Sequence, residues 1–337
     1  MLRFGVIGLG DIAVTEHLPA LERNKNAVIA GISTRNAERL QEIKAKYKVP
    51  FATSDYKELL SREDIDVVIV ATPPWVTPEI TKEALLAGKD VLCEKPVAMT
   101  IEEAKEMKET ALKTGRKLMV GMCHHNDVIL EKLRSWVSSD RIGHPLLLRV
   151  SIYDEKWDPE ENPEHYERLF NTLKYGSPSI HEGPHIFDWL HVLTGQEIKS
   201  LTSYGYKSRE EFPAQNYDIT MLQYENGDVG KVEIGWFLKQ FPGYTFEAVG
   251  PYGIASMNSY ERSAKLTLDG VTEEFFETSG RDWLTHDFDR QTERFIRTVE
   301  DNLEVDPDID DAIYTMRVTD AIRESMKTGR TVELAKE

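Results

Sequence analysis

A chain of 337 residues is long enough to form two domains with separate buried cores. Its 58 acidic residues outnumber its 41 lysines and arginines, and the net charge of −17 argues against nucleic acid or an anionic membrane as partner. No apolar run approaches the roughly 20 residues of a membrane span, and the chain starts in a predicted strand rather than a signal peptide. Cys93 and Cys123 lie in apolar surroundings, which indicates a reducing compartment. We therefore expect a cytoplasmic location.

The first part of the chain alternates short apolar runs with segments of helical period. The runs are continuously apolar, which is typical of strands buried on both faces of a parallel sheet. Thr100 with Glu103 and Asp55 with Glu58 predict capping boxes, and Gly115 falls where a helix should end. These features predict a doubly wound, Rossmann-type α/β domain over residues 1–122. Its predicted strands are Phe4–Ile7, Val28–Ile32, Val67–Val70, Asp90–Cys93 and Leu118–Met122.

A glycine-rich turn follows the first predicted strand. Gly8, Gly10 and Ala13 form the pattern G-x-G-x-x-A, and Asp11 and Ile12 lie between the last two. In a dinucleotide-binding fold this turn opens a helix whose N-terminus receives the pyrophosphate. The pattern gains weight from the second strand, which follows at the expected distance. We therefore expect all five residues to contact a nucleotide.

The segment after the second predicted strand selects between NAD and NADP. A carboxylate there would bind the ribose 2′-hydroxyl of NAD and repel a 2′-phosphate, but the chain has Ser33, Thr34 and Arg35. The hydroxyls can donate hydrogen bonds to a phosphate, and the guanidinium can bind it through two bonds. The segment favours NADP over NAD. The alternative is that Arg35 is a solvated residue at a helix start.

Two more motifs stand at the carboxyl ends of predicted strands, where open α/β folds bind ligands. Ala71, Thr72 and Pro73 let the chain bend away from a dinucleotide. Glu94 and Lys95 end the next strand, and the proline that follows restricts the backbone of Lys95. A lysine beside an oxidised nicotinamide has its ammonium form disfavoured, so it becomes a candidate for proton transfer. The alternative is a solvated Glu-Lys pair.

After residue 122 the strands change to alternating polar and apolar residues. Glu225-Asn226-Gly227-Asp228 predicts a hairpin turn, and consecutive strands joined by turns predict a mostly antiparallel sheet. We expect a substrate-binding and oligomerisation α+β domain with a large open sheet over residues 123–337, whose last helix could pack back on the first domain. The predicted strands are Leu147–Ile152, Leu201–Tyr206, Asp218–Tyr224, Val229–Trp236, Phe246–Val249 and Ala264–Leu268, and the helices are Val128–Val137, Trp283–Glu300 and Asp310–Thr328.

In their order and spacing these motifs resemble the glucose–fructose oxidoreductase/inositol dehydrogenase (Gfo/Idh/MocA) family. The resemblance covers nearly the whole chain, and the Glu-Lys-Pro motif at residues 94–96 is its most specific part. It implies a pyridine-nucleotide enzyme acting on a sugar, polyol or similar alcohol. Lys95 would match the family's catalytic lysine, His185 the histidine that accepts or returns the hydroxyl proton, and Asp188 the aspartate one turn later.

The chain departs from the family pattern beside the matched histidine. The family commonly has an aspartate four residues before it, where this chain has His181. That carboxylate would hold the histidine's tautomer. Without it, His181 could relay a proton, or the acid–base role could rest more on Lys95 and His185. Thr77 also stands where a histidine often follows the Thr-Pro turn, and Met122–Asn126 replaces a segment with asparagine and arginines.

Further candidates for ligand contact come from the second domain and its border. His181 and His185 could share a helix face and bind a metal, but the glycine and proline between them make a regular helix doubtful, and we predict no metal site. His124 is a weaker substrate candidate, because strand-end histidines more often form local hydrogen bonds. Trp157 and Tyr153 could stack on a sugar ring, or could simply anchor the segment 153–178, predicted to be a long loop over the active-site crevice.

We therefore expect an NAD(P)-dependent dehydrogenase, with NADP favoured, that moves hydride between the nicotinamide and a secondary alcohol or ketone of a carbohydrate-like substrate. Three alternatives stay open: a sugar lyase or epimerase that keeps its nucleotide bound, a metal-assisted lyase, and a non-enzymatic nucleotide- or sugar-binding protein. The resemblance suggests a homodimer or homotetramer formed through the open sheet, whose outer face is predicted to carry Tyr204, Tyr206 and Trp236. The alternative is a helix of the same chain covering that face.

Overall fold

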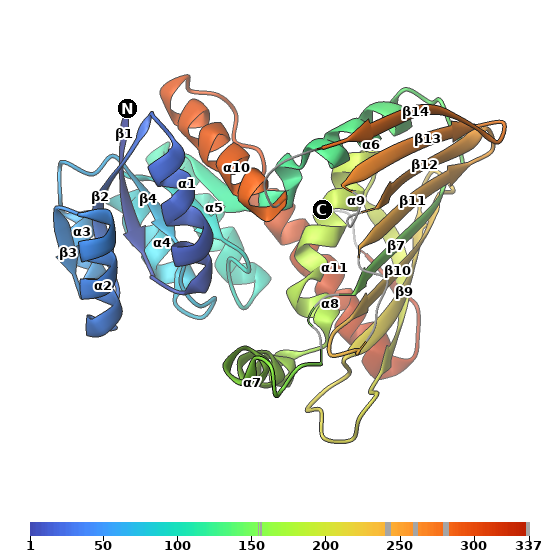
Figure 1. Ribbon diagram of the computed structural model, residues 1–337, viewed down its shortest axis with the longest axis horizontal. Helices are drawn as coiled ribbons and strands as arrows, with labels where there is room; N and C mark the ends of the chain where they lie inside the picture. Colours follow the sequence, from blue (N-terminus) through green and yellow to red (C-terminus); the bar gives the residue numbers. More distant parts are fainter. Residues whose placement is uncertain (154, 156, 240–243, 259–261, 279–282, 335–337) are drawn as a thin grey trace. The chain divides into compact units, whose positions relative to one another are not determined.

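The computed structural model describes residues 1–153, 155, 157–239, 244–258, 262–278 and 283–334 (Figure 1). The chain divides into two compact units, the first formed by Met1–Asn126 with Arg281–Tyr314 and the second by Asp127–Gly280 with Thr315–Glu337. The predicted boundary after residue 122, and the roles assigned to the two domains, stay predictions. Within the described ranges no helix is both long and apolar enough to span a membrane.

The first unit is built on six parallel strands in the order β3-β2-β1-β4-β5-β6. The strand order reverses between β1 and β4, and this is the switch point at which open α/β sheets bind ligands. The doubly wound fold is therefore confirmed, although the short strand β3 was not predicted. The strands are β1 (Leu2–Ile7), β2 (Ala27–Ser33), β3 (Phe51–Thr53), β4 (Val67–Val70), β5 (Asp90–Glu94) and β6 (Leu118–Gly121).

Helices from both ends of the chain complete the first unit. Helix α10 (Trp283–Glu300) packs against α1, and the ring of Phe295 meets that of Phe4 on β1 at 6.2 Å in the sheet's apolar core. Figure 1 shows α10 in orange beside the blue N-terminal segment. The other helices are η1 (Ala13–His17), α1 (Leu18–Arg23), α2 (Ala37–Tyr47), α3 (Tyr56–Leu60), α4 (Thr77–Leu86), α5 (Ile101–Thr114), the short η2 (Cys123–Asn126) and the first residues of α11 (Ile309–Thr328).

Local capping explains where two of these helices begin and end. Thr100 and Glu103 form the predicted capping box of α5, and Gly115 ends that helix with a left-handed backbone, φ +64°. The predicted box at α3 is incomplete. Asp55 caps the helix by accepting from the N–H of Lys57, but the Glu58 carboxylate accepts from the Thr53 hydroxyl instead of the cap backbone.

The second unit is a nine-stranded sheet in the order β14-β13-β12-β11-β7-β10-β9-β8-β15. Every neighbouring pair is antiparallel except β7 with β10, so the predicted mostly antiparallel sheet is confirmed. The strands β12, β14 and β15 were not predicted. The bounds are β7 (Leu147–Tyr153), β8 (Ile198–Tyr206), β9 (Tyr217–Tyr224), β10 (Val229–Gly235), β11 (Thr245–Gly250), β12 (Gly253–Asn258), β13 (Ser263–Leu268), β14 (Val271–Glu277) and β15 (Val332–Glu333).

Helices cover one face of this sheet and leave the other open. In Figure 1 the helices α6, α8, α9 and α11 lie along the same side of the strands. On the opposite face Tyr204 and Tyr206 are 62% and 60% exposed, as predicted. Trp236 is a correction, because it is only 1% exposed and packs into an aromatic cluster with Phe237 and Phe212. The helices are α6 (Val128–Ser138), α7 (Pro163–Thr172), η3 (Leu173–Tyr175), α8 (Pro178–His181), α9 (Gly183–Thr194) and the rest of α11.

The segment predicted as a long loop, residues 153–178, contains regular structure. Residues 154 and 156 lie outside the described part of the chain, but the rest includes helix α7 and the short η3. Tyr166, Leu169, Phe170 and Leu173 recur at helical spacing and pack against the aromatic cluster. The loop prediction was therefore wrong, because the polar residues between these positions hid an amphipathic period.

Candidate nucleotide and proton-transfer site

A pocket of about 450 Å³ opens in the first unit at the carboxyl ends of four adjacent strands. It contains eight of the residues predicted to bind a nucleotide, from the turns after β1, β2 and β4. Sequence reasoning missed those that follow β3 or open helices α3 and α4, because no motif marks them. The lining is Ile7, Gly8, Leu9, Gly10, Ser33, Thr34, Arg35, Asn36, Ser54, Tyr56, Ala71, Thr72, Pro73, Val76, Glu79 and Ile80.

The two glycines of the turn serve different purposes. Gly8 has a positive φ of +92°, and a Cβ there would overlap the carbonyl oxygen of Ala71 on the neighbouring strand exit. Gly10 has an ordinary backbone, and a Cβ there would meet nothing within 4 Å. Its missing side chain therefore leaves open space at the pocket wall. A dinucleotide phosphate fits such a position, because it needs close approach to backbone N–H groups.

The exit of β2 presents polar groups to the pocket. Ser33 is buried, and Thr34 Oγ1 accepts a hydrogen bond from the N–H of Asn36 at 3.4 Å, which leaves its hydroxyl proton available to a ligand. Arg35 is exposed, and it has no hydrogen bond or ion pair with any residue that the structure describes. A guanidinium in this position can bind a phosphate without first losing a protein partner.

The Thr-Pro turn after β4 is held by the start of the next helix. The Thr77 hydroxyl lies 2.9 Å from the carbonyl of Thr72 and 3.1 Å from that of Pro73, and it also contacts the Thr72 hydroxyl at 2.7 Å. Thr77 is fully buried. The residue that departs from the family pattern is therefore part of the turn itself and fixes the wall of the pocket.

Tyr56 and Glu79 add a mixed wall that the sequence did not indicate. Burial, together with a hydrogen bond to Glu83, raises the pKa of the Tyr56 phenol to about 12. The phenol is therefore a hydrogen-bonding group rather than an acid near neutral pH. Glu79 lines the same pocket and places a carboxylate among otherwise neutral groups and Arg35.

Five of the predicted cofactor contacts do not line this pocket. Asp11 and Ile12 are exposed at the start of the turn helix, and Ala13 is fully buried as the first residue of η1. Glu94 turns its carboxylate into the unit, where it meets His17. Lys95, next to it, is half-buried at the carboxyl end of β5. The predicted roles of these residues toward a cofactor stay predictions.

The predicted proton-transfer residues of the second unit lie around a helix break. Helix α8 ends at His181 and α9 begins at Gly183, so that the expected interruption before Pro184 is confirmed. His185 and Asp188 are buried in the first turns of α9. The ring of His181 stacks on that of Trp236 at 5.5 Å with 18° between the planes. Trp236 is thus a support for His181 rather than an outer-face residue.

A buried carboxylate holds the start of α8. Asp218 on β9 accepts hydrogen bonds from the hydroxyl of Ser179 and, at 3.3 Å, from the N–H of Ser179. Burial raises the pKa of Asp218 to about 6, although these hydrogen bonds favour its charged form. The carboxylate therefore anchors the short helix that ends at His181.

The three remaining substrate candidates have protein partners. The Tyr153 hydroxyl donates to Glu233 at 2.9 Å on the open face of the sheet. Trp157 packs into the aromatic cluster, with the guanidinium of Arg209 3.9 Å above its ring. His124 Nδ1 lies 2.8 Å from a carboxylate oxygen of Asp287. The Trp157 contacts fit the structural alternative of an anchoring aromatic, whereas the hydrogen-bond partner of His124 is a distant residue on α10 rather than a local one.

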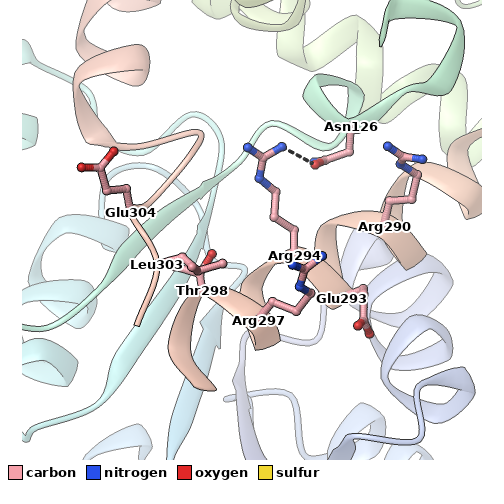
Figure 2. Close-up of a pocket in the computed structure, with 8 residues that line it drawn as sticks. All are labelled: Asn126, Arg290, Glu293, Arg294, Arg297, Thr298, Leu303 and Glu304. Carbon is pink, nitrogen blue, oxygen red and sulfur yellow. Dashed lines mark hydrogen bonds between the residues drawn. The ribbon is translucent and has the colours of Figure 1, made fainter. Parts of the chain in front are cut away.

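A second pocket of the first unit, about 490 Å³ in volume, runs along α10 (Figure 2). Three arginines and two glutamates line it, so that it has little excess positive charge. Figure 2 marks the hydrogen bond from Arg294 to Asn126, 3.2 Å long, and Arg294 also pairs with Asp306. This pocket contains none of the predicted site residues. Its lining is Asn126, Arg290, Glu293, Arg294, Arg297, Thr298, Leu303 and Glu304.

Comparison with known proteins matches both parts of the chain to one family. Residues 2–122 match the model described as "Oxidoreductase family, NAD-binding Rossmann fold" (GFO_IDH_MocA), and residues 134–334 match that of its C-terminal alpha/beta domain. An uncharacterized oxidoreductase of Bacillus subtilis, YrbE, is 26% identical over 98% of this chain and 96% of its own. A myo-inositol 2-dehydrogenase of Thermotoga maritima is 28% identical over 69% of this chain and 68% of its own.

Solved structures agree with the fold. The scyllo-inositol dehydrogenase of Lactobacillus casei, solved with NAD(H) and scyllo-inositol, superposes with a TM-score of 0.85 over the full length of both chains. Its sequence is only 17% identical, so this likeness concerns the fold alone.

Proposed function

The chain belongs to the oxidoreductase family with an NAD-binding Rossmann fold (GFO_IDH_MocA), and on this premise we propose that it is an NADP-preferring dehydrogenase of a carbohydrate-like secondary alcohol. The single observation that carries the cofactor assignment is the pocket at the switch point of the first sheet, where Gly10 leaves open space. The relatives named as inositol dehydrogenases support a polyol or cyclitol as the substrate class.

The preference for NADP rests on the exit of β2. Residues 33–36 offer two hydroxyls, an exposed guanidinium and an amide, with no carboxylate among them. A 2′-phosphate gains charge-assisted hydrogen bonds from such a set, whereas the 2′-hydroxyl of NAD would lose its usual acidic partner. Among the described residues that line this pocket, Glu79 supplies a carboxylate that a nucleotide would have to accommodate.

In the proposed reaction the nicotinamide handles the hydride and side chains of the protein handle the proton. A bound nicotinamide supplies the acceptor or donor of hydride. Lys95, at the carboxyl end of β5, holds or takes up the hydroxyl proton of the substrate, and His185 on α9 shares this task. His181, stacked on Trp236, stands where the family has an aspartate, and we assign it the relay of that proton.

The open face of the second sheet supports assembly of this chain with itself. Tyr204 and Tyr206 expose aromatic surface next to the half-buried Tyr217 and Ile219 of the adjacent strand. Such a face buries apolar area when two copies meet. We therefore include a homodimer or homotetramer in the proposal, and sedimentation velocity of wild type and Y204E/Y206E tests it. A wild-type monomer would remove this part alone.

A substrate panel tests the proposed activity directly. The purified chain is assayed with cyclitols, sugars, polyols and keto-sugars in the presence of NAD or NADP, and reduced nucleotide is followed by absorbance. We expect turnover with at least one of these substrates and a higher kcat/KM for NADP. Tight nucleotide binding without turnover would favour a binding protein, and substrate conversion without net reduced nucleotide would favour a lyase or epimerase.

A further inference from the structure

A buried hydrogen bond joins the nucleotide-turn helix to the strand that carries the proposed proton-transfer lysine. His17 Nε2 lies 2.7 Å from Oε1 of Glu94, although the two residues are 77 positions apart in the chain. The histidine is 0% exposed and the glutamate 6% exposed. A buried carboxylate needs such a partner, because water cannot replace it.

The Glu94 carboxylate also binds the backbone of Lys95. Oε2 of Glu94 accepts a hydrogen bond from the backbone N–H of Lys95 at 3.2 Å. One carboxylate therefore binds a side chain of η1 with one oxygen and the backbone of the lysine with the other. Since the backbone N–H lies next to Cα, a change in the orientation of the carboxylate would alter the direction in which the Lys95 side chain leaves the strand.

The surroundings allow the carboxylate little choice of position. A Cβ at Gly121, on the neighbouring strand β6, would lie 2.6 Å from Oε1 and 3.1 Å from Cα of Glu94. The ring of Phe288, on helix α10, meets the His17 ring edge-on at 4.9 Å, with 89° between the planes. Strand β6 thus packs closely against the Glu94 carboxylate and helix α10 against its histidine partner, so that the hydrogen bond from His17 decides which way the carboxylate faces within this packing.

The position of His17 also relates it to the nucleotide turn. It is the last residue of η1, a π-helical stretch that begins at Ala13, the final position of the glycine motif. π-helical turns are rare and occur mostly as single turns inside helices, frequently at functional sites. The motif proposed to bind the pyrophosphate and the lysine proposed to move the proton are therefore joined through one side chain.

We propose that His17 is a positioning residue, which fixes the Glu94 carboxylate and through it the backbone of Lys95. This inference rests on the proposed role of Lys95 in proton transfer. His17 touches no reacting atom. It sets the direction of the lysine, so its loss lowers kcat and leaves nucleotide binding nearly intact.

The variants follow from the geometry. H17F keeps a ring against Phe288 but removes the donor to Glu94, and H17Q returns an amide N–H near the position of Nε2. G121A displaces the carboxylate by crowding its Oε1 while His17 stays in place, so the test survives if H17F does not fold. H125F is the matched control, because it breaks another histidine–carboxylate pair of the first unit, His125 Nε2 with Asp306 at 3.0 Å, whose carboxylate comes from a different segment than Glu94.

Kinetics give the first readout. We expect H17F and G121A to lower kcat about 10- to 100-fold, less than the roughly 10²- to 10⁴-fold contribution of a general acid or base because the lysine itself is retained, with less than about threefold change in the nucleotide Kd. H17Q should recover kcat to within about threefold of wild type, and H125F should keep it. A merely structural role would lower the melting temperature of H17F and leave kcat unchanged, and this result would overturn the inference.

A second readout does not depend on turnover. Lysines are labelled by reductive ¹³C-methylation, and the Lys95 signal is identified by its loss in K95R. We expect the chemical shift and titration of this signal to change in H17F and G121A but not in H17Q or H125F. An unchanged signal in H17F overturns the positioning role even if the enzyme is active. Wild type without turnover on any substrate, together with a changed signal in H17F, would instead overturn the proposed function and retain the structural coupling.

Discussion

Replacing each glycine of the nucleotide turn by alanine separates the effect on nucleotide binding from the effect on folding, because the two positions differ in the space around them. In G10A the new methyl group meets nothing within 4 Å, and the backbone there has no positive φ. Folding should therefore be unchanged or improved by about 0.4–1 kcal/mol, the usual effect of replacing a compatible glycine by alanine. In G8A the methyl group overlaps the Ala71 carbonyl and the backbone keeps φ +92°. We expect G8A to lose about 3 kcal/mol or more of stability from strain and overlap.

Nucleotide affinity should follow the opposite pattern. The G10A methyl group occupies the space proposed for the pyrophosphate, so that at least one charge-assisted hydrogen bond to a phosphate is lost. Such a bond contributes about 1.5–3 kcal/mol, which corresponds to a Kd raised roughly 10- to 150-fold for both NAD and NADP. Fluorescence titration measures the Kd, and thermal unfolding measures stability on the same samples. If G10A folds and binds both nucleotides like wild type, the open space at Gly10 is not the phosphate position.

Three further outcomes follow from individual side chains. R35Q should raise the Kd of NADP about 10-fold or more while that of NAD changes less than about twofold, and equal losses would show that Arg35 does not meet the 2′-phosphate. K95M should lower kcat about 10²- to 10⁴-fold with near-normal nucleotide binding, and a fully active variant would remove Lys95 from the mechanism. Asp218 has a pKa raised to about 6 from 3.8, so the folded state holds its proton more tightly than the unfolded state. The free energy of unfolding should therefore fall by up to about 3 kcal/mol as pH rises from about 4 to 6, and D218N should lack this component in a series of denaturant titrations.

Features of the chain encoded by neighbouring residues were predictable from the sequence. The strand Val67–Val70 is a continuous run of branched apolar residues, and the Thr100–Glu103 capping box is complete within four positions. The polar and glycine residues of the nucleotide turn and of the β2 exit are also adjacent in the sequence. The structure places both segments in one pocket. The presence of Gly8 and Gly10 in the pocket wall could therefore be expected from the sequence.

Features that depend on distant partners could not be predicted. The burial of Trp236 depends on the rings of His181 and Phe212, which come from other segments of the chain. The short strand β3 has three residues, too few for a period to be visible. His17 carries no motif that points to Glu94, and only the fold brings the two side chains to 2.7 Å. Such pairs are visible only once the strands and helices are assembled.

The proposed function requires that the chain move hydride between a carbohydrate-like alcohol and NADP. The most direct test uses a substrate from the panel deuterated at its alcohol carbon, with NADP, and follows both the nicotinamide by NMR and the ratio of reduced nucleotide to consumed substrate. We expect deuterium on the nicotinamide ring and one reduced nucleotide for each substrate molecule converted. Conversion of the substrate without deuterated nucleotide accumulating would contradict the proposed function.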